Sequence, residues 1–210
     1  STVHATADMM TLHVGAVARG APDKFIVADM PFLTCSKGLG VAMDTVERLM
    51  QAGAHAVKIE GDSHQLEIIR HIVEAGVPVM GHLGLTPQSI HHLGGHRVQG
   101  KDEVNAAKIV EGARRLEAAG CFSLVLECVP TALGGCVSQA LKIPTIGIGA
   151  GPQTDGQVLV LQDLLGVNPK FKPKFLRQYA SGHSVVSDAV NQFHGDVVAG
   201  GFPTLAESYR

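Results

Sequence analysis

The sequence predicts a parallel β/α barrel, because apolar segments, polar segment ends and helical stretches follow one another in regular order. Buried parallel strands are apolar along most of their length, and their carboxyl ends open on the active site of such a barrel. Five apolar segments end on polar or turn residues in this way, at 25–32, 55–61, 77–84, 124–130 and 144–151. We therefore expect a candidate active site where these segments end.

Helices and strands alternate along the chain. Periodicity predicts helices, most of which stop near a Gly as helix C-termini prefer, at 7–19, 39–52, 63–75, 102–119 and 131–141. Strands are predicted at 25–29, 55–60, 77–82, 122–127 and 144–149. Residues 157–166 fit either a short strand or a helix, and the remainder has a helical pattern to about residue 199. This order of elements is that of successive β/α units.

The segment from 85 to 100 is predicted to be a loop that is long enough to be functional. It follows His82 and contains His91, His92 and His96. We expect this loop to act as a lid over the site. His91 and His92 by themselves are more typical of a solvated pair of loop residues.

The number of predicted strands is smaller than a closed barrel requires. Such a barrel has eight strands and about 250 residues, whereas five strands are clear here and a sixth is weak. The chain also opens on Ser1-Thr2 and a helix, where a strand is expected. We therefore predict one domain over residues 1–210 that lacks two β/α units at its start, with C-terminal helices from about residue 173.

Composition excludes several classes of protein. A formal net charge of −2 gives no basic surface for nucleic acid, and no apolar run approaches the 18 to 20 residues that span a bilayer. The start of the chain lacks the pattern of a signal peptide. The four cysteines have no C-x-x-C spacing, which favours reduced thiols over disulfides or zinc ligands. We predict a soluble cytoplasmic protein.

Lys58 and Glu60 are expected to point together into the barrel, since residues two apart on a strand share a face. Asp29 ends the neighbouring strand, so its carboxylate should reach the same layer of side chains. Two carboxylates suit Mg²⁺, which also takes oxygens from water and substrate, such as the carboxylate and ketone of a 2-oxo acid. Chelation would acidify the carbon next to the ketone. Lys58 could then neutralise the enolate, and Glu127 could act as the base.

Each of these residues also has a structural interpretation. An acidic residue at a strand end is often a helix N-cap or a surface residue, and Lys58 with Glu60 could be a salt bridge. His82 alone is more typical of a hydrogen-bonded interior histidine. The glycines at 147, 149 and 151 could bind phosphate or merely permit a tight turn, and no Lys or Arg lies near them. The functional interpretation depends on the delivery of several such residues to one end.

Five strings in the chain are similar to those of the ketopantoate hydroxymethyltransferase (3-methyl-2-oxobutanoate hydroxymethyltransferase) family. They are Ala28-Asp29-Met-Pro-Phe32, Val57-Lys58-Ile-Glu60-Gly61, Gly81-His82-Leu-Gly-Leu-Thr-Pro-Gln-Ser89, Val125-Leu-Glu127-Cys-Val-Pro130 and Ile146-Gly-Ile-Gly-Ala-Gly151, the last followed by Thr154-Asp-Gly156. The resemblance runs from Ser1 to about Pro203, and the string from Gly81 is highly specific.

The resemblance implies a (β/α)8 TIM barrel of the phosphoenolpyruvate/pyruvate-binding superfamily. It implies transfer of a one-carbon unit from 5,10-methylenetetrahydrofolate to 3-methyl-2-oxobutanoate with Mg²⁺, in pantothenate and coenzyme A synthesis. Members are usually cytoplasmic homo-oligomers, often decamers.

Carried onto this sequence, the resemblance implies that Asp29 is a metal ligand and substrate contact and that Glu60 is a metal-site carboxylate. Lys58 becomes a substrate contact and Glu127 the proton acceptor, with His82 as a further substrate-binding candidate. The family also carries two earlier strands, the second ending in Gly-Asp-Ser, whose Asp binds metal and whose Ser helps bind the oxo acid. Neither strand occurs here, so we expect the sequence to be a fragment.

Two other functions are considered from the sequence. One is a carbon–carbon lyase or mutase of the isocitrate lyase/phosphoenolpyruvate mutase superfamily, which typically carries a Lys-Lys-Cys-Gly-His lid. That string is absent, and Gly-Leu-Thr-Pro-Gln-Ser occupies residues 84–89 instead. The other is an inactive, truncated assembly subunit, which only the missing strands favour.

Overall fold

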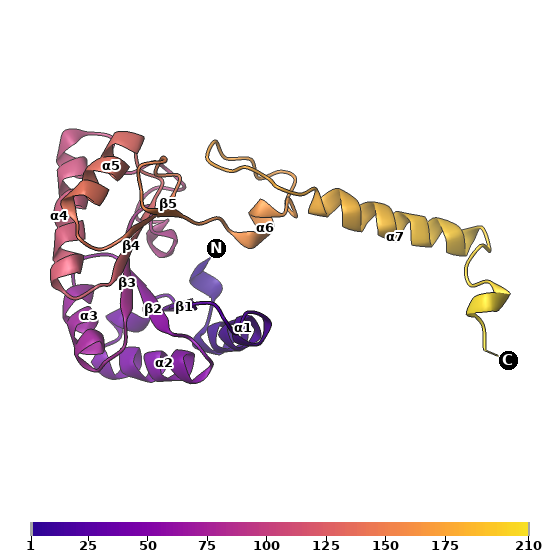
Figure 1. Ribbon diagram of the computed structural model, residues 1–210, viewed down its shortest axis with the longest axis horizontal. Coiled ribbons are helices and arrows are strands. Elements are labelled where there is room, and N and C mark those ends of the chain that lie inside the picture. The colour runs from indigo at the N-terminus through magenta and orange to yellow at the C-terminus, as the bar shows by residue number, and fades with distance from the viewer. Residues whose placement is uncertain (1, 210) are drawn as a thin grey trace. The chain divides into compact units, whose positions relative to one another are not determined.

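The computed structural model describes residues 2–209. The chain divides into two compact units, Ser1–Val158 and Leu159–Arg210, and the single domain predicted over 1–210 stays a prediction. The first unit contains six strands that form one parallel sheet in sequential order (Figure 1). Their bounds are β1 Val27–Asp29, β2 Ala56–Glu60, β3 Val79–Gly84, β4 Ser123–Glu127, β5 Thr145–Ile148 and β6 Gly156–Gln157.

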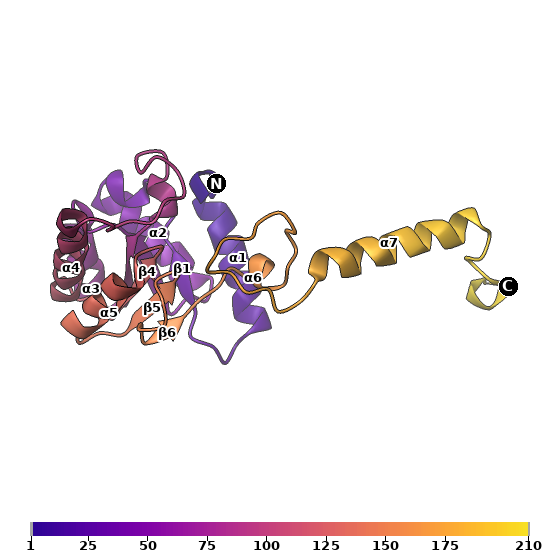
Figure 2. The same ribbon diagram turned by 90° about the horizontal axis from the view of Figure 1, so that it is seen from above.

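Helices separate most of the strands, and this produces the predicted β/α order. Those of the first unit are α1 Ala7–Gly20, α2 Leu39–Gln51, α3 Gln65–Glu74, α4 Glu103–Ala118 and α5 Thr131–Ala140. Helices α2 to α5 lie along one side of the strands, as Figure 1 and the view from above in Figure 2 show. Parallel strands joined by helices in sequential order are the arrangement of a β/α barrel. The α/β class with a parallel sheet is thus confirmed, and closure into eight strands remains a prediction.

Local sequence signals determine where the helices begin and end. The Thr6 hydroxyl accepts the Met9 N–H at 3.2 Å ahead of α1, and the Asp102 carboxylate accepts the Asn105 N–H at 2.9 Å ahead of α4. Such N-caps typically stabilise a helix by about 1 kcal/mol. Gly53 follows α2 with a φ of 110°, a conformation that side chains with a Cβ rarely adopt. The predicted helix boundaries are therefore close to those observed.

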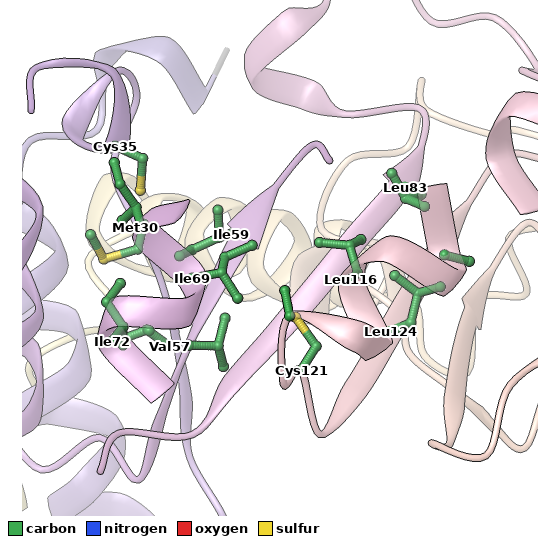
Figure 3. Packing of buried hydrophobic residues seen from close by; sticks show 14 of the residues in the cluster. Met30, Cys35, Val57, Ile59, Ile69, Ile72, Leu83, Leu116, Cys121 and Leu124 are labelled. Carbon is green, nitrogen blue, oxygen red and sulfur yellow. The ribbon is translucent and has the colours of Figure 1, made fainter. Parts of the chain in front are cut away.

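The core lies between the strands and the covering helices. Val57 and Ile59 of β2 are buried beside Ile69 and Ile72 of α3, as Figure 3 shows. Full burial of one such side chain contributes roughly 1.5 to 3 kcal/mol. Because alternate residues face opposite ways, this packing turns Lys58 to the other face of β2. The core thus sets the direction of the candidate site residues.

The second unit has fewer helical residues than predicted. It contains α6 Leu161–Leu164, α7 Gly182–Val198 and the short 3₁₀ helix η4 Leu205–Glu207. The prediction of helices from about residue 173 is wrong, because α7 begins only at Gly182. The Tyr179 and Gly182 N–H groups instead donate to the carbonyls of Leu164 and Leu165, each at 2.8 Å.

Two further features concern the chain as a whole. Among the described residues, no helix is long and apolar enough to cross a membrane. Cys35, Cys121, Cys128 and Cys136 are all free thiols.

Candidate active site

The carboxyl ends of four neighbouring strands bring the predicted residues together. Asp29 is the last residue of β1, Glu60 the last of β2 and Glu127 the last of β4, while His82 lies in β3. The strand register pairs Asp29 with Lys58 and Glu60 with His82. All five predicted site residues therefore belong to one contiguous cluster, which sequence position alone could not establish.

Lys58 lies between the two carboxylates of β1 and β2. Its Nζ is 3.2 Å from Asp29 Oδ1 and 4.0 Å from Glu60 Oε1. The Lys58 and Glu60 side chains are only 15% and 8% exposed, whereas Asp29 is 52% exposed. Both the salt bridge and the shared face that the sequence predicts are thus present. Asp29 is the member of this group that solvent, or a ligand, reaches most easily.

His82 is the buried centre of the cluster. Its ring is 2% exposed, and its Nδ1 is 3.3 Å from Lys58 Nζ. A charged lysine can only donate, so where Nδ1 accepts this bond the imidazole proton is on Nε2. That Nε2 makes no hydrogen bond within the described residues, although Glu127 Oε2 lies 3.4 Å away. A buried polar group without a partner costs about 1 to 3 kcal/mol, and it is typical of sites where a ligand completes the bonding.

The pKa of the Glu60 carboxyl is lower than that of an ordinary glutamate. Burial alone would raise the pKa of this carboxyl, but His82 at 3.8 Å and Lys58 at 4.0 Å lower it, as does the Gln88 N–H at 3.0 Å. The net pKa of Glu60 is lowered. Hydrogen-bond donors and a nearby ammonium group favour the charged form of a carboxyl over its neutral form. Glu60 is therefore a carboxylate at neutral pH.

The cysteines near the cluster do not supply a nucleophile. Burial raises the pKa of the Cys35 thiol to about 11. A hydrogen bond with Thr34 acts in the opposite direction but has the smaller effect. Burial, and then the charge of Glu127, raises the pKa of the Cys128 thiol to about 11. Thiols react as thiolates, so both are inert near neutral pH. Acid–base chemistry at this site falls to the carboxylates, Lys58 and His82.

Asp29 and Glu60 are a small ligand set for a metal ion. The described residues contain no group of three or more His, Cys, Asp or Glu side chains arranged to hold one. Mg²⁺ needs only one or two protein carboxylates, because waters and substrate oxygens complete its octahedral shell. The oxygen donors at these two positions therefore fit Mg²⁺, and the Lys58 ammonium is the cation with which it would compete.

Two cavities adjoin the ends of β1 and β2. The smaller, of about 30 Å³, is lined by residues that include Glu60, Gln88, Cys35 and Met30. The larger, of about 470 Å³, shares Pro31 and Leu33 with the first and is also lined by Lys37, Asp44 and Arg48. A volume of roughly 300 to 1,000 Å³ is typical of sites for small organic ligands. The larger cavity thus has room for such a ligand, but its lining contains none of the five cluster residues and only the smaller cavity reaches Glu60.

Several features of the site were missed by sequence reasoning. Gln88 contacts Glu60, yet only its place in the specific string from Gly81 to Ser89 could have drawn attention to it. Cys128, next to Glu127, has a φ of 49°, and Leu33 has a φ of 62°. Non-glycine residues with positive φ cluster at functional sites, but sequence gives little sign of them.

The glycine run that begins in β5 and continues beyond it has a packing role in this structure. A Cβ added at Gly147 would lie 2.5 Å from Thr154 Oγ1, and one at Gly151 would lie 2.5 Å from Thr131 Cγ2. Side chains larger than hydrogen have no room there, which favours the tight-turn interpretation over a phosphate loop. His91 and His92 are exposed, as expected of a solvated pair.

Several solved structures of low sequence identity have a similar fold. A phosphonopyruvate hydrolase in complex with oxalate and Mg²⁺ aligns with a TM-score of 0.59 at 13% identity, over 98% of this chain and 74% of that one. A phosphoenolpyruvate phosphomutase from Streptomyces platensis subsp. rosaceus aligns with a TM-score of 0.58 at 15% identity, over 95% and 70%. 2,3-Dimethylmalate lyase, of the PEP mutase/isocitrate lyase superfamily, has a TM-score of 0.54 at 15% identity, over 100% and 73%. At such identities the likeness concerns the fold alone.

Curated proteins are much more similar in sequence. The 3-methyl-2-oxobutanoate hydroxymethyltransferase of Bdellovibrio bacteriovorus is 54% identical over all of this chain and 80% of its own length. Its counterpart in Francisella tularensis subsp. novicida is 51% identical over 100% of this chain and 79% of the relative. The sequence model of the ketopantoate hydroxymethyltransferase family matches residues 1–205. With the strand-end cluster, these matches identify the chain as a member of the ketopantoate hydroxymethyltransferase family.

Proposed function

We propose that this chain is a 3-methyl-2-oxobutanoate hydroxymethyltransferase, which moves a one-carbon unit from 5,10-methylenetetrahydrofolate to 3-methyl-2-oxobutanoate to give 2-dehydropantoate. Family membership supports the activity. The observation that carries the proposal is the separation of Glu127 from Asp29, Lys58 and Glu60, with the buried His82 ring between them. Asp29, Lys58 and Glu60 can thus bind the oxo acid, while Glu127 removes its proton.

Asp29 and Glu60 would hold Mg²⁺ in this proposal. When bound, Mg²⁺ would polarise the ketone of the oxo acid and so acidify the neighbouring C3–H. Asp29 would also contact the substrate, in keeping with its greater exposure. Lys58 would donate to the substrate, since its ammonium lies between the two carboxylates and has three protons to give.

Glu127 would remove the C3 proton. A carboxylate that is not tied to a cation is free to act as a base, and within the described residues the ion-pair partner of Glu127 is His82 Nε2 at 3.4 Å. The His82 Nε2–H would donate to the bound oxo acid. The C3 carbanion would then form a bond to the one-carbon unit of the folate, with water supplying the hydroxyl group and tetrahydrofolate leaving.

Loss of the C3 proton tests the proposal directly. When the purified chain is mixed with Mg²⁺ and 3-methyl-2-oxobutanoate in deuterated water, the C3–H signal of the oxo acid should disappear from the NMR spectrum. Addition of 5,10-methylenetetrahydrofolate should then produce the signals of a hydroxymethyl group. A folded chain that gives neither result would refute the proposed activity. We also propose that the chain forms a homo-oligomer, a decamer as in many members of the family, and sedimentation of the same sample tests this.

Asp29→Asn is expected to weaken metal binding and oxo-acid turnover together. The substitution keeps the shape but removes a negative charge, and carboxylates are the ligands by which proteins hold Mg²⁺. A titration with Mg²⁺, followed by calorimetry and by the C3 exchange rate, measures both effects. Undiminished Mg²⁺-dependent exchange in this variant would remove Asp29 from the metal site.

Lys58→Met separates a structural role from substrate binding. If Lys58 binds the oxo acid, the dissociation constant of the oxo acid should be about 10- to 100-fold higher in the variant, since a hydrogen bond to a charged group contributes about 1.5 to 3 kcal/mol. If Lys58 only pairs with its buried neighbours, loss of the pair should cost roughly 3 to 5 kcal/mol of stability. Calorimetric titration with the oxo acid and a thermal melt of the same variant distinguish the two. An unchanged dissociation constant with a strongly lowered Tm would leave Lys58 a structural role.

A further inference from the structure

The loop of residues 85–100 is attached to the strand that carries the proposed base. The Leu85 N–H donates to the Glu127 carbonyl at 2.8 Å, and the Gln99 N–H donates to the Cys128 carbonyl at 2.8 Å. Both ends of the loop are thus bonded to the carboxyl end of β4. The loop is therefore anchored beside Glu127 whatever its middle does.

Gln88, near the start of the loop, joins it to the other side of the site. Its backbone N–H donates to Glu60 Oε2 at 3.0 Å, and its side-chain Nε2 donates to the Met30 carbonyl at 2.8 Å. Met30 directly follows Asp29, and the Met30 N–H donates to the Lys58 carbonyl at 2.9 Å. A single residue thus contacts both a proposed metal-site carboxylate and the backbone next to the other one.

The chemistry of the contacts explains why this residue is a glutamine. The Met30 carbonyl is an acceptor, so a carboxylate in place of the amide could not bond to it and an aliphatic side chain would leave it unpaired. Gln88 is half-buried, where hydrogen bonds are screened little by water. Pro87 lies at the first position of the 3₁₀ helix η3 Pro87–Ser89, where its fixed φ favours the turn. The turn aims the Gln88 N–H, and the side chain holds the turn in place.

We propose that Gln88 is a positioning residue, which holds the ends of β1 and β2 at the spacing that the oxo acid and its cation require. The inference rests on the proposed function and deepens it. Gln88 acts through Asp29 and Glu60 and through the fixed loop. Its side chain contacts the protein backbone and so has no direct role in proton transfer.

The variant Gln88→Leu tests this proposal, with Gln99→Leu as the matched control. Leucine removes the bond to Met30 but keeps the backbone N–H. Gln99 lies in the same loop, and its side chain donates only within the loop, to the Arg97 carbonyl at 2.9 Å. We expect the dissociation constant of 3-methyl-2-oxobutanoate with Mg²⁺ to rise about 5- to 10-fold in Gln88→Leu, as loss of one buried hydrogen bond predicts. The control should bind like the unmodified chain.

Two further readouts separate positioning from general loss of structure. In Gln88→Leu the Tm should stay within about 3 °C of the unmodified chain, because one hydrogen bond shifts it little. Hydrogen exchange, read by mass spectrometry, should accelerate in residues 85–90 of Gln88→Leu and stay unchanged in the control. A dissociation constant equal to that of the unmodified chain would overturn the proposal, as would unaltered exchange in the loop.

The experiment also separates this inference from the proposed function. If the unmodified chain neither exchanges the C3 proton nor binds the oxo acid, the proposed function fails. In that case, amide hydrogen exchange of residues 85–90 still shows whether Gln88 holds the loop against Glu60 and Met30. If the unmodified chain is active and Gln88→Leu matches it in every readout, only the positioning role fails.

Discussion

Glu127→Gln should slow exchange of the C3 proton of 3-methyl-2-oxobutanoate by a factor of about 10² to 10⁴, the usual contribution of a general base. The amide keeps the shape of the side chain but cannot accept the proton. Binding of the oxo acid should survive, because the Lys58 ammonium and the Asp29 and Glu60 carboxylates lie on the other side of the His82 ring. NMR in deuterated water without folate measures this step alone.

Cys136→Ser provides the control for Glu127→Gln. Cys136 is an exposed residue of α5 and is not one of the cluster residues, so this change should leave exchange and binding unaltered. Exchange in Glu127→Gln at the rate of the unmodified chain would move the base elsewhere. His82 would be the next residue to test, since its Nε2 lies 3.4 Å from Glu127 Oε2.

Gly84→Ala should lower the free energy of unfolding by about 2 to 5 kcal/mol, through two separate costs. Gly84 has a φ of 91°, where a Cβ costs roughly 1 to 2 kcal/mol. A Cβ there would also lie 2.2 Å from the Glu127 carbonyl oxygen, and such overpacking typically costs a further 1 to 3 kcal/mol. Because that oxygen belongs to the backbone, the end of β4 must move. We therefore expect slower proton exchange as well as lower stability, with stability measured by urea unfolding.

Gly76→Ala is the control that measures the cost of the positive φ by itself. Gly76 has a φ of 92°, but nothing lies within 4 Å of the position of an added Cβ. Its substitution should therefore cost only the roughly 1 to 2 kcal/mol of the backbone conformation and leave exchange of the oxo acid unchanged. Equal destabilisation by the two substitutions would show that the close approach of Gly84 to β4 is relieved without cost.

Much of the site could be predicted from local sequence, since strand geometry is periodic. Lys58 and Glu60 are two residues apart, so one face had to carry both once Val57 and Ile59 packed against α3. Asp29 and Glu127 each end an apolar strand, and parallel strands deliver their carboxyl ends to one edge. The order of the elements and the helix ends followed from apolar periodicity and from residues such as Gly53 and Asp102.

The tertiary structure decided what depends on contacts between distant segments. His82 was an ambiguous interior histidine in the sequence, and only strand pairing placed it between Lys58 and Glu127. Gln88 reaches Met30 over 58 residues, a contact that no local pattern encodes. Residues 173–181 have a helical pattern, but the Tyr179 N–H donates to the Leu164 carbonyl of α6 instead. Local propensity determines which segments can form helices or strands, whereas the competition for hydrogen-bond partners is settled only when the chain has folded.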